Sequence, residues 1–249
     1  MAFAALVACC VAVVVALFAS LSLPAAAPVP ERGAGLANVT PTLVAIDTFL
    51  RGADADAFLR QPDAALLPPY YLGAFWNPRS GVHPARFASA EAMAKSRLAF
   101  ARMKQIVARL HAAGVPLHAG TDAPAIGVVP GASLHRELHL LVAAGLTPEE
   151  ALATSTRNGP AFLAIPGLGE IRPGAPADLA IFRRDPTRDL AALDSLEAVV
   201  RGGRFYTREA LDAQLAVYQA SHRSWLRERF AAPVMSASLR ALLWLAPRG

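Results

Sequence analysis

The stretch VPLHAGTDA, residues 115–123, is a short apolar run that ends in a Gly-Thr-Asp-Ala turn. Segments with the apolar periodicity of a helix lie on both sides of it, at residues 89–113 and 133–144. A short apolar run bounded by turn residues is typical of a buried strand. Helix, strand, aspartate-bearing loop and helix together give the rhythm of a βα unit, so this stretch predicts an α/β fold.

The helices around this strand carry local start and stop signals. The helix at residues 89–113 is followed by Gly114, the residue type favoured just beyond a last helical turn. A further helix is expected to begin at Thr147, with Pro148 in its first position. Glu150 is placed to reach back to Thr147 and complete a capping box, which fixes this boundary from local sequence.

Strand-like segments occur on both sides of this helical region. The β-branched run at residues 39–44 predicts a short strand that leads into a helical turn. After Gly167 we expect short strands at 169–171, 177–182, 196–200 and 205–206, the last two joined by a glycine turn at 201–204. The tail from Leu211 again has helical periodicity, with a break at Pro233.

The net charge of +5 raises the question of a nucleic-acid partner. The positive charges are arginines apart from Lys95 and Lys104, and they are scattered and often adjacent to acids, as in Arg184-Asp185. No basic stripe interleaved with aromatic residues is present, so we expect no nucleic-acid partner. Cysteine occurs at Cys9 and Cys10 alone, which excludes a cysteine-based zinc site in the rest of the chain.

Residues 4–23 contain no charged side chain, and as a helix they would be long enough to cross a bilayer core. The small residues that follow, at 23–27, resemble a signal-peptidase site, but no basic residue precedes the apolar run. Three interpretations stay open: a membrane anchor, a cleaved export signal, and a segment that is not the natural start of the protein. The first two predict a membrane-anchored or exported protein, and the third a cytoplasmic one.

Seven short segments resemble imidazolonepropionase-like members of the metal-dependent amidohydrolases in order and spacing. They are GTDA at 120–123, LHREL at 134–138, AGLTPEEAL at 144–152, NGPA at 158–161, GEIRPG at 169–174, ADL at 177–179 and VVRGGR at 199–204. Each segment alone is a weak signal, but seven in order are hard to obtain by chance. The resemblance runs from about Leu36 to Leu215.

This resemblance implies the C-terminal part of a TIM-like (β/α)8 barrel beside strands of a small β-sandwich. We therefore expect an apolar leader at 1–27, a linker at 28–35, a partial barrel at 36–165, sandwich strands at 166–210 and a helical tail at 211–249. The leader would form an N-terminal apolar helix. Its presence, together with Trp225 and Trp244 in the tail, leaves open an association with a membrane.

Active sites of such barrels lie at the C-terminal ends of the strands, where Asp122 follows the strand at 115–119. The resemblance implies that Asp122 is both a metal ligand and the catalytic residue that takes a proton from the metal-bound water. The metal implied is divalent and usually zinc, which lowers the pKa of bound water. The structural alternative is an aspartate whose side chain caps the glycine loop that follows.

The other candidate residues are less specific. The resemblance places His135 and Glu137 near the mouth of the pocket, and the alternative for both is an exposed helix surface. His118 has the strand parity of Asp122, so it points into the barrel either as a group that supports the metal ligands or as a core histidine. His139 lies four residues after His135, but Glu137 is not adjacent to the first histidine, as the zinc-protease signature requires.

The remaining metal ligands implied by the resemblance, a His-x-His pair, a bridging lysine or glutamate and two further histidines, belong upstream of Leu36. No histidine precedes His83 in this sequence. The sequence therefore predicts a truncated amidohydrolase that hydrolyses carbon–nitrogen bonds of a small, cyclic or peptide-like amide. The alternative is a non-catalytic, membrane-associated remnant or partner module. Open sheet edges would favour self-association in either case.

Overall fold

The computed structural model describes residues 38–52, 58–75, 89–123, 125 and 127–223, with scattered positions between 229 and 241. The predicted apolar leader, the linker and the tail residues Trp225 and Trp244 lie outside the described residues. Within the described part, no helix is long and apolar enough to cross a membrane.

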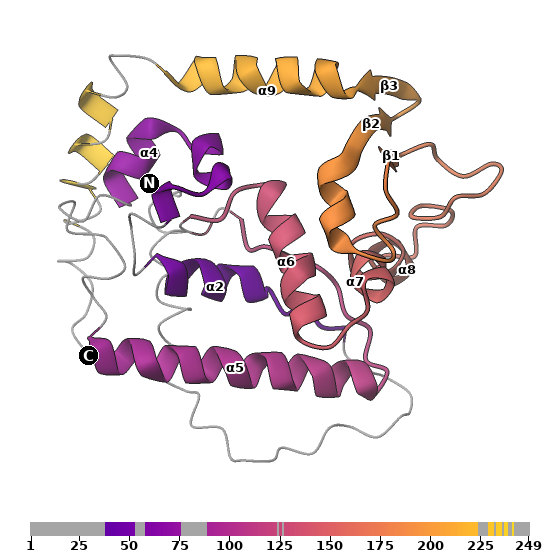
Figure 1. Cartoon of the computed structure of the whole chain (residues 1–249), viewed down its shortest axis with the longest axis horizontal. Coiled ribbons are helices and arrows are strands. Elements are labelled where there is room, and N and C mark those ends of the chain that lie inside the picture. The colour runs from indigo at the N-terminus through magenta and orange to yellow at the C-terminus, as the bar shows by residue number, and fades with distance from the viewer. Residues whose placement is uncertain are drawn as a thin grey trace.

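The described elements follow one another as helices first and a small sheet afterwards (Figure 1). In chain order they are α2 (Leu43–Arg51), η1 (Pro62–Leu66), α4 (Pro69–Phe75), α5 (Ala90–Ala112), α6 (Ala132–Ala143), α7 (Pro148–Ser155), α8 (Asn158–Phe162), β1 (Leu179–Phe182), η3 (Leu190–Ser195), β2 (Leu196–Arg201), β3 (Arg204–Thr207) and α9 (Arg208–His222).

The boundaries of α5 and α7 are those that the local signals predict. The Ser89 hydroxyl accepts a hydrogen bond from Ala92 N at 3.1 Å, and Gly114, with φ 77°, follows the end of α5. At the start of α7, Thr147 Oγ1 accepts from Glu150 N at 3.2 Å, and Glu150 Oε2 accepts from Thr147 N at 2.8 Å. The predicted capping box is therefore confirmed.

The strand predicted at residues 115–119 is reduced to a single parallel bridge between Leu117 and Val39, and the residues around this bridge do not form a longer strand. Val39 N donates to Pro116 O at 3.0 Å, and His118 N donates to Val39 O at 2.9 Å. The prediction of a strand over residues 39–44 is wrong beyond this bridge, because α2 begins at Leu43. Thr42, with φ 52°, takes the left-handed conformation and so ends the extended run.

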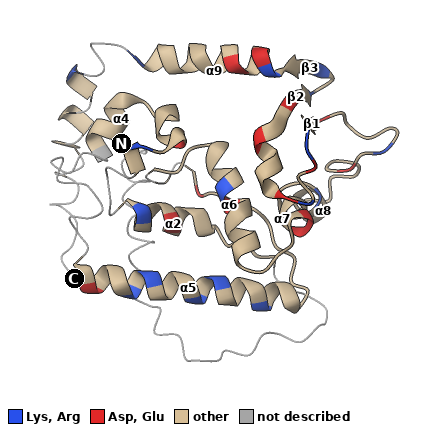
Figure 2. Ribbon diagram, viewed as in Figure 1, with Lys and Arg blue, Asp and Glu red and all other residues tan. Residues whose placement is uncertain are grey.

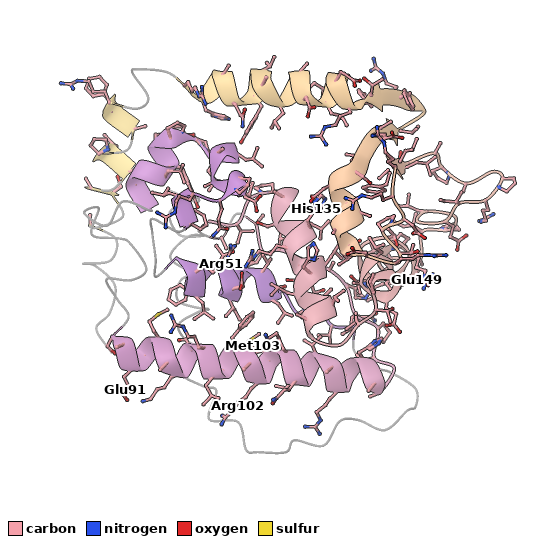
Figure 3. The ribbon with its side chains drawn as sticks, in the orientation of Figure 1. Arg51, Glu91, Arg102, Met103, His135 and Glu149 are labelled. Atoms are coloured by element: carbon pink, nitrogen blue, oxygen red, sulfur yellow. The ribbon has the colours of Figure 1, made fainter. Side chains whose placement is uncertain are left out.

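The main core lies where α2, α5 and α6 pack around this paired segment. Leu43 and Leu141 are fully buried, and Leu117 and Leu138 are nearly so. Met103 points from α5 toward α2, while Glu91 and Arg102 on the same helix point away from the body (Figure 3). Most of the charged side chains along α5 are Lys or Arg (Figure 2). α5 is therefore an outer helix with one apolar side.

The sheet is antiparallel, in the order β1-β2-β3. Leu179 lies opposite Val200, which in turn lies opposite Phe205. Gly202 and Gly203, with φ 55° and 76°, form the two-residue turn between β2 and β3, where both central residues need positive φ. The predicted strands at 177–182, 196–200 and 205–206 are confirmed, each with ends shifted by one or two residues.

The predicted strand at 169–171 is wrong. Residues 169–171 pair with no strand that the structure describes, and Ile171 is 91% exposed. Gly169 has φ 79° and lies against the carbonyl of Thr156, so the chain turns at this point instead of extending. A strand-like composition without a neighbouring edge leaves the backbone groups of the segment to solvent.

α9 follows β3 directly, with Thr207 Oγ1 accepting from Ala210 N at 3.3 Å, so the predicted helix begins three residues earlier than Leu211. α9 has no buried residue, and Figure 1 shows it on the side of the molecule opposite α5. The described chain is thus an α/β fold with a small antiparallel sheet, as predicted.

Candidate functional site

Asp122 follows the paired strand segment at its C-terminal end. Leu117 is buried in the core formed by α2, α5 and α6, so the alternation of a strand places His118 on the opposite side, away from these three helices. Asp122 is exposed and has φ 55°. The structure gives its carboxylate no hydrogen-bond partner among the described residues. Its backbone carbonyl accepts from Ala125 N at 2.7 Å, so among the described residues this loop is closed by a main-chain hydrogen bond.

The turn after Val39 lies against the turn that carries Asp122. A Cβ atom built on Gly120 would overlap the Cγ2 methyl of Thr40 and would lie 3.7 Å from Thr42 Oγ1. Thr42 and Asp122 both have positive φ, which is uncommon for residues other than glycine and costs a β-branched residue most. Left-handed non-glycine residues concentrate at functional sites. Here two of them occupy neighbouring turns at one end of a parallel pair.

His118 is held by protein groups next to this turn. Its Nε2 atom lies 2.8 Å from Asn38 Oδ1, and its ring centroid lies 5.4 Å from that of Phe162. The His118 ring has a hydrogen-bond partner, as a core histidine would have. The ring is only half-buried, however, so His118 is not a core residue.

His135 and Glu137 occupy opposite environments on α6. His135 is exposed (Figure 3), as is His139 one turn later. Glu137 is fully buried, and its two carboxylate oxygens accept hydrogen bonds from Leu43 N at 3.1 Å and Val44 N at 2.7 Å. The alternative of an exposed surface is therefore wrong for Glu137. Its spacing from Leu134, Leu138 and Leu141 places it on the apolar side of the helix.

Burial raises the pKa of Glu137 to about 7, and the hydrogen bonds from Val44 and Leu43 oppose this rise. Asp47 on α2 adds a smaller upward contribution through its negative charge. Asp47 is itself paired with Arg51 and Arg136, through contacts of 3.0 and 2.5 Å between Nε and Oδ2. These three charged groups and Glu137 join α2 to α6. The sequence gives no sign of their pairing, since it depends on how two distant helices pack.

The described residues do not make up a metal centre. They contain no cluster of three or more His, Cys, Asp or Glu side chains able to hold a metal ion. A catalytic zinc normally has three protein ligands. At the C-terminal end of the strand segment, the described chain presents one free carboxylate, that of Asp122, which does not fit a complete site.

A pocket of about 220 Å³ lies at the other end of the strand segment. His111 Nε2 lies 3.3 Å from Glu150 Oε1 at its wall, and Asn158 Nδ2 donates to Leu117 O at 2.8 Å. The pocket is lined by Val115 and Pro116, at the start of the segment that pairs with Val39, whereas Asp122 follows the end of this segment. It is therefore separate from the predicted site.

Comparison with known proteins bears on this arrangement. Residues 78–205, more than half of the chain, match the Amidohydrolase family. The chain belongs to the amidohydrolase family. The matched residues include Asp122, Glu137, β1, β2 and the first half of β3, so the turn with the candidate carboxylate and most of the sheet of this amidohydrolase-family chain fall within the similarity.

Two curated relatives match parts of this amidohydrolase-family chain. The imidazolonepropionase of Ruegeria sp. (strain TM1040) is 38% identical over 108 residues, which cover 40% of this chain and 25% of the relative. The 8-oxoguanine deaminase of Pseudomonas aeruginosa is 34% identical over 97 residues, covering 36% of this chain and 22% of the relative. The match thus spans about a quarter of the length of each relative.

A solved structure also resembles this amidohydrolase-family chain. The bottromycin amidohydrolase superposes with a TM-score of 0.59 at 24% identity, covering 75% of this chain and 40% of that protein. At this level of identity the likeness supports the fold alone.

Proposed function

We propose that this chain forms the C-terminal part of a metal-dependent amidohydrolase and contributes Asp122 to its catalytic site. The supporting observation is the position of Asp122, which follows the C-terminal end of a parallel strand segment, exposed and without a side-chain partner among the described residues. Barrel enzymes carry their catalytic residues at this end of the strands. An exposed carboxylate there is available to bind a cation or to accept a proton.

Under this proposal residues 36–165 are part of a (β/α)8 barrel, and residues 166–210 are strands of a small sandwich. The single parallel bridge between Val39 and Leu117 would be one junction of the barrel. The antiparallel sheet of β1, β2 and β3 would be the sandwich component. In each case further strands must come from outside the described residues or from another chain.

The divalent metal of the proposal, zinc in the first instance, lowers the pKa of a bound water when it is held by enough ligands. Asp122 would be one ligand, and the others would come from outside the described residues. Because the described residues do not complete the site, we assign no reaction step to the metal. What we assign to this chain is a carboxylate at the strand end that binds the cation or accepts a proton.

The reaction proposed is hydrolysis of a carbon–nitrogen bond in a small cyclic or peptide-like amide. Imidazolonepropionate and 8-oxoguanine, named in the two relatives, are the first compounds to test, followed by a dipeptide. The full chain is assayed with added zinc, as wild type and as Asp122→Asn. Asp194→Asn is the matched control, since Asp194 is exposed on η3.

If Asp122 is the proton acceptor, its loss lowers turnover by about a hundredfold or more, while Asp194→Asn retains wild-type turnover. Equal turnover in wild type and Asp122→Asn would refute the role. Zinc bound at one equivalent in Asp122→Asn would show that the metal does not depend on this carboxylate. If the wild-type chain gives no turnover, zinc binding is compared instead: weaker binding by Asp122→Asn, with Asp194→Asn unchanged, supports the carboxylate as a ligand, and equal binding refutes that role.

A further inference from the structure

The N-terminus of α2 is capped by a side chain from another helix. Thr42, the residue before α2, is left-handed and makes no side-chain cap. The free amides of a first helical turn need acceptors, which a neighbouring Ser, Thr, Asp or Asn normally provides. At α2 the acceptor is Glu137, whose two oxygens bind the amides of Leu43 and Val44, 94 and 93 residues away in sequence.

The charge of Glu137 has no cationic partner in the part of the chain that the structure describes. Arg136 and Arg51, the nearby bases, contact Asp47 instead. The carboxylate is thus balanced by backbone amides and by the positive end of the α2 dipole. Since Glu137 is fully buried, these amides must remain in place for the carboxylate to be solvated at all.

Fixing the start of α2 also fixes the turn before it. Thr42 is directly bonded to Leu43, and its left-handed conformation is strained for a β-branched residue. Such strain persists only where the surroundings hold it. On its other side this turn contacts the strand end that leads to Asp122, because Thr40 and Thr42 pack against Gly120.

We infer that Glu137 is a positioning residue of the proposed site: its carboxylate holds the amides of Leu43 and Val44 and thereby keeps the Thr40–Thr42 turn against Gly120, two residues before Asp122. This inference rests on the proposed function for its catalytic meaning. The chain of contacts itself, which runs from Glu137 on α6 through the start of α2 to the Asp122 turn, can be tested without measuring turnover.

The test is NMR spectroscopy of the full chain, labelled with 15N and 13C, at pH 8. The variant is Glu137→Gln, whose amide nitrogen replaces one accepting oxygen. Glu91→Gln is the control, because Glu91 lies on the exposed side of α5 and pairs only with exposed Lys95 among the described residues. The amides of Val107 on α5 and Ala198 on β2, which are buried and lie outside α6, report whether the fold remains intact.

In Glu137→Gln we expect amide exchange at Leu43 and Val44 to be about tenfold faster or more. The amide resonances of Thr40, Gly120 and Asp122 are expected to shift, while those of Val107 and Ala198 and the same resonances in the control stay in place. The inference is overturned if exchange at Leu43 and Val44 increases but Gly120 and Asp122 keep their wild-type resonances. That result would make Glu137 a local helix cap without influence on the site.

A second measurement covers the case in which Glu137→Gln does not fold. In the wild-type chain, the carboxyl carbon of Glu137 and the amides of Gly120 and Asp122 are followed as the pH is varied. A component with the Glu137 midpoint in the titration curves of Gly120 and Asp122 supports the link, and the absence of such a component overturns it. Where hydrolysis is observed, Glu137→Gln should lower kcat about tenfold with little change in KM. Failure of Asp122→Asn to affect hydrolysis would refute the proposed function and leave the NMR result standing.

Discussion

Gly120 lies directly against Thr40, with no space for a methyl group between them. Gly120 does not have positive φ, so the glycine is needed here for close approach and not for backbone conformation. The contact joins the ends of two segments that pair in parallel, and the candidate carboxylate of Asp122 follows within two residues. The packing of this pair therefore decides where the Asp122 turn sits.

The change Gly120→Ala is expected to lower the free energy of unfolding by about 1–3 kcal/mol, because the new methyl overlaps the Thr40 methyl in a packed region. Urea unfolding followed by circular dichroism measures the loss. Gly159→Ala is the control, since a Cβ there meets no atom within 4 Å and should change stability little. Adding Thr40→Ser, which removes the opposing methyl, should restore most of the loss. A Gly120→Ala variant as stable as wild type would contradict the contact.

Because Glu137 is buried, the free energy of unfolding is expected to fall as the pH rises from about 4.5 to 7. The pKa of Glu137 in the folded protein is about 7, raised by burial from the ordinary 4.5. In this window the folded state holds a proton that the unfolded chain has released, so raising the pH favours unfolding. The full effect is about 3 kcal/mol. Measuring urea unfolding at pH 5 and pH 8 should show a larger loss for wild type than for Glu137→Gln.

Other groups also titrate over this range, so the comparison needs a variant that removes an exposed acid. Glu91→Gln serves this purpose and should follow the wild-type pH dependence. Parallel pH profiles for wild type and Glu137→Gln would show that the buried carboxyl does not titrate near neutral pH.

Asp47→Asn should destabilise the packing of α2 on α6. Asp47 is 13% exposed and pairs with both Arg51 and Arg136, so its loss leaves two neighbouring guanidinium groups without their acid. Burial lowers the pKa of Arg51, and the positive charge of Arg136 lowers it further. The negative charge of Asp47 acts in the opposite direction and stabilises the charged form of Arg51. We expect a loss of about 1–3 kcal/mol, below that of a fully buried pair.

The control for this change is Asp212→Asn on α9, where the pair with Arg208 is half exposed on both sides. Exposed pairs contribute less than about 1 kcal/mol, so this variant should stay close to wild type. Thermal or urea unfolding measures the stability of both variants. An equal loss of stability in Asp47→Asn and Asp212→Asn would show that the ion pairs between α2 and α6 stabilise the fold no more than an exposed pair does.

Where sequence signals were local, they predicted the structure well. The capping box of Thr147 and Glu150 involves residues three positions apart, and the Ser89 cap and Gly114 bound α5 in the same way. The glycine pair at 202–203 similarly specifies the turn between β2 and β3. Each of these motifs satisfies its own backbone groups, so its outcome does not depend on the rest of the fold.

Long-range partners account for what the sequence did not predict. Glu137 is an acid on an otherwise apolar helix side, and its acceptor role depends on the start of α2. Residues 39–44 have the composition of a strand. Thr42, however, adopts the left-handed conformation, and α2 begins at Leu43 within this run. Residues 169–171 are equally strand-like and find no edge to join among the described strands. In all three cases the deciding contact comes from elsewhere in the chain.

The origin of the α2 cap also matters during synthesis. Leu43 is translated 94 residues before Glu137, an interval on the order of ten seconds at ordinary elongation rates. Until Glu137 is synthesised, the first amides of the nascent α2 lack the side chain that binds them in the folded chain, and only water can accept from them. The capped form of α2 can therefore be completed only after α6 has been synthesised. A chain stalled before α6 would expose the apolar side of α2 to chaperones and proteases.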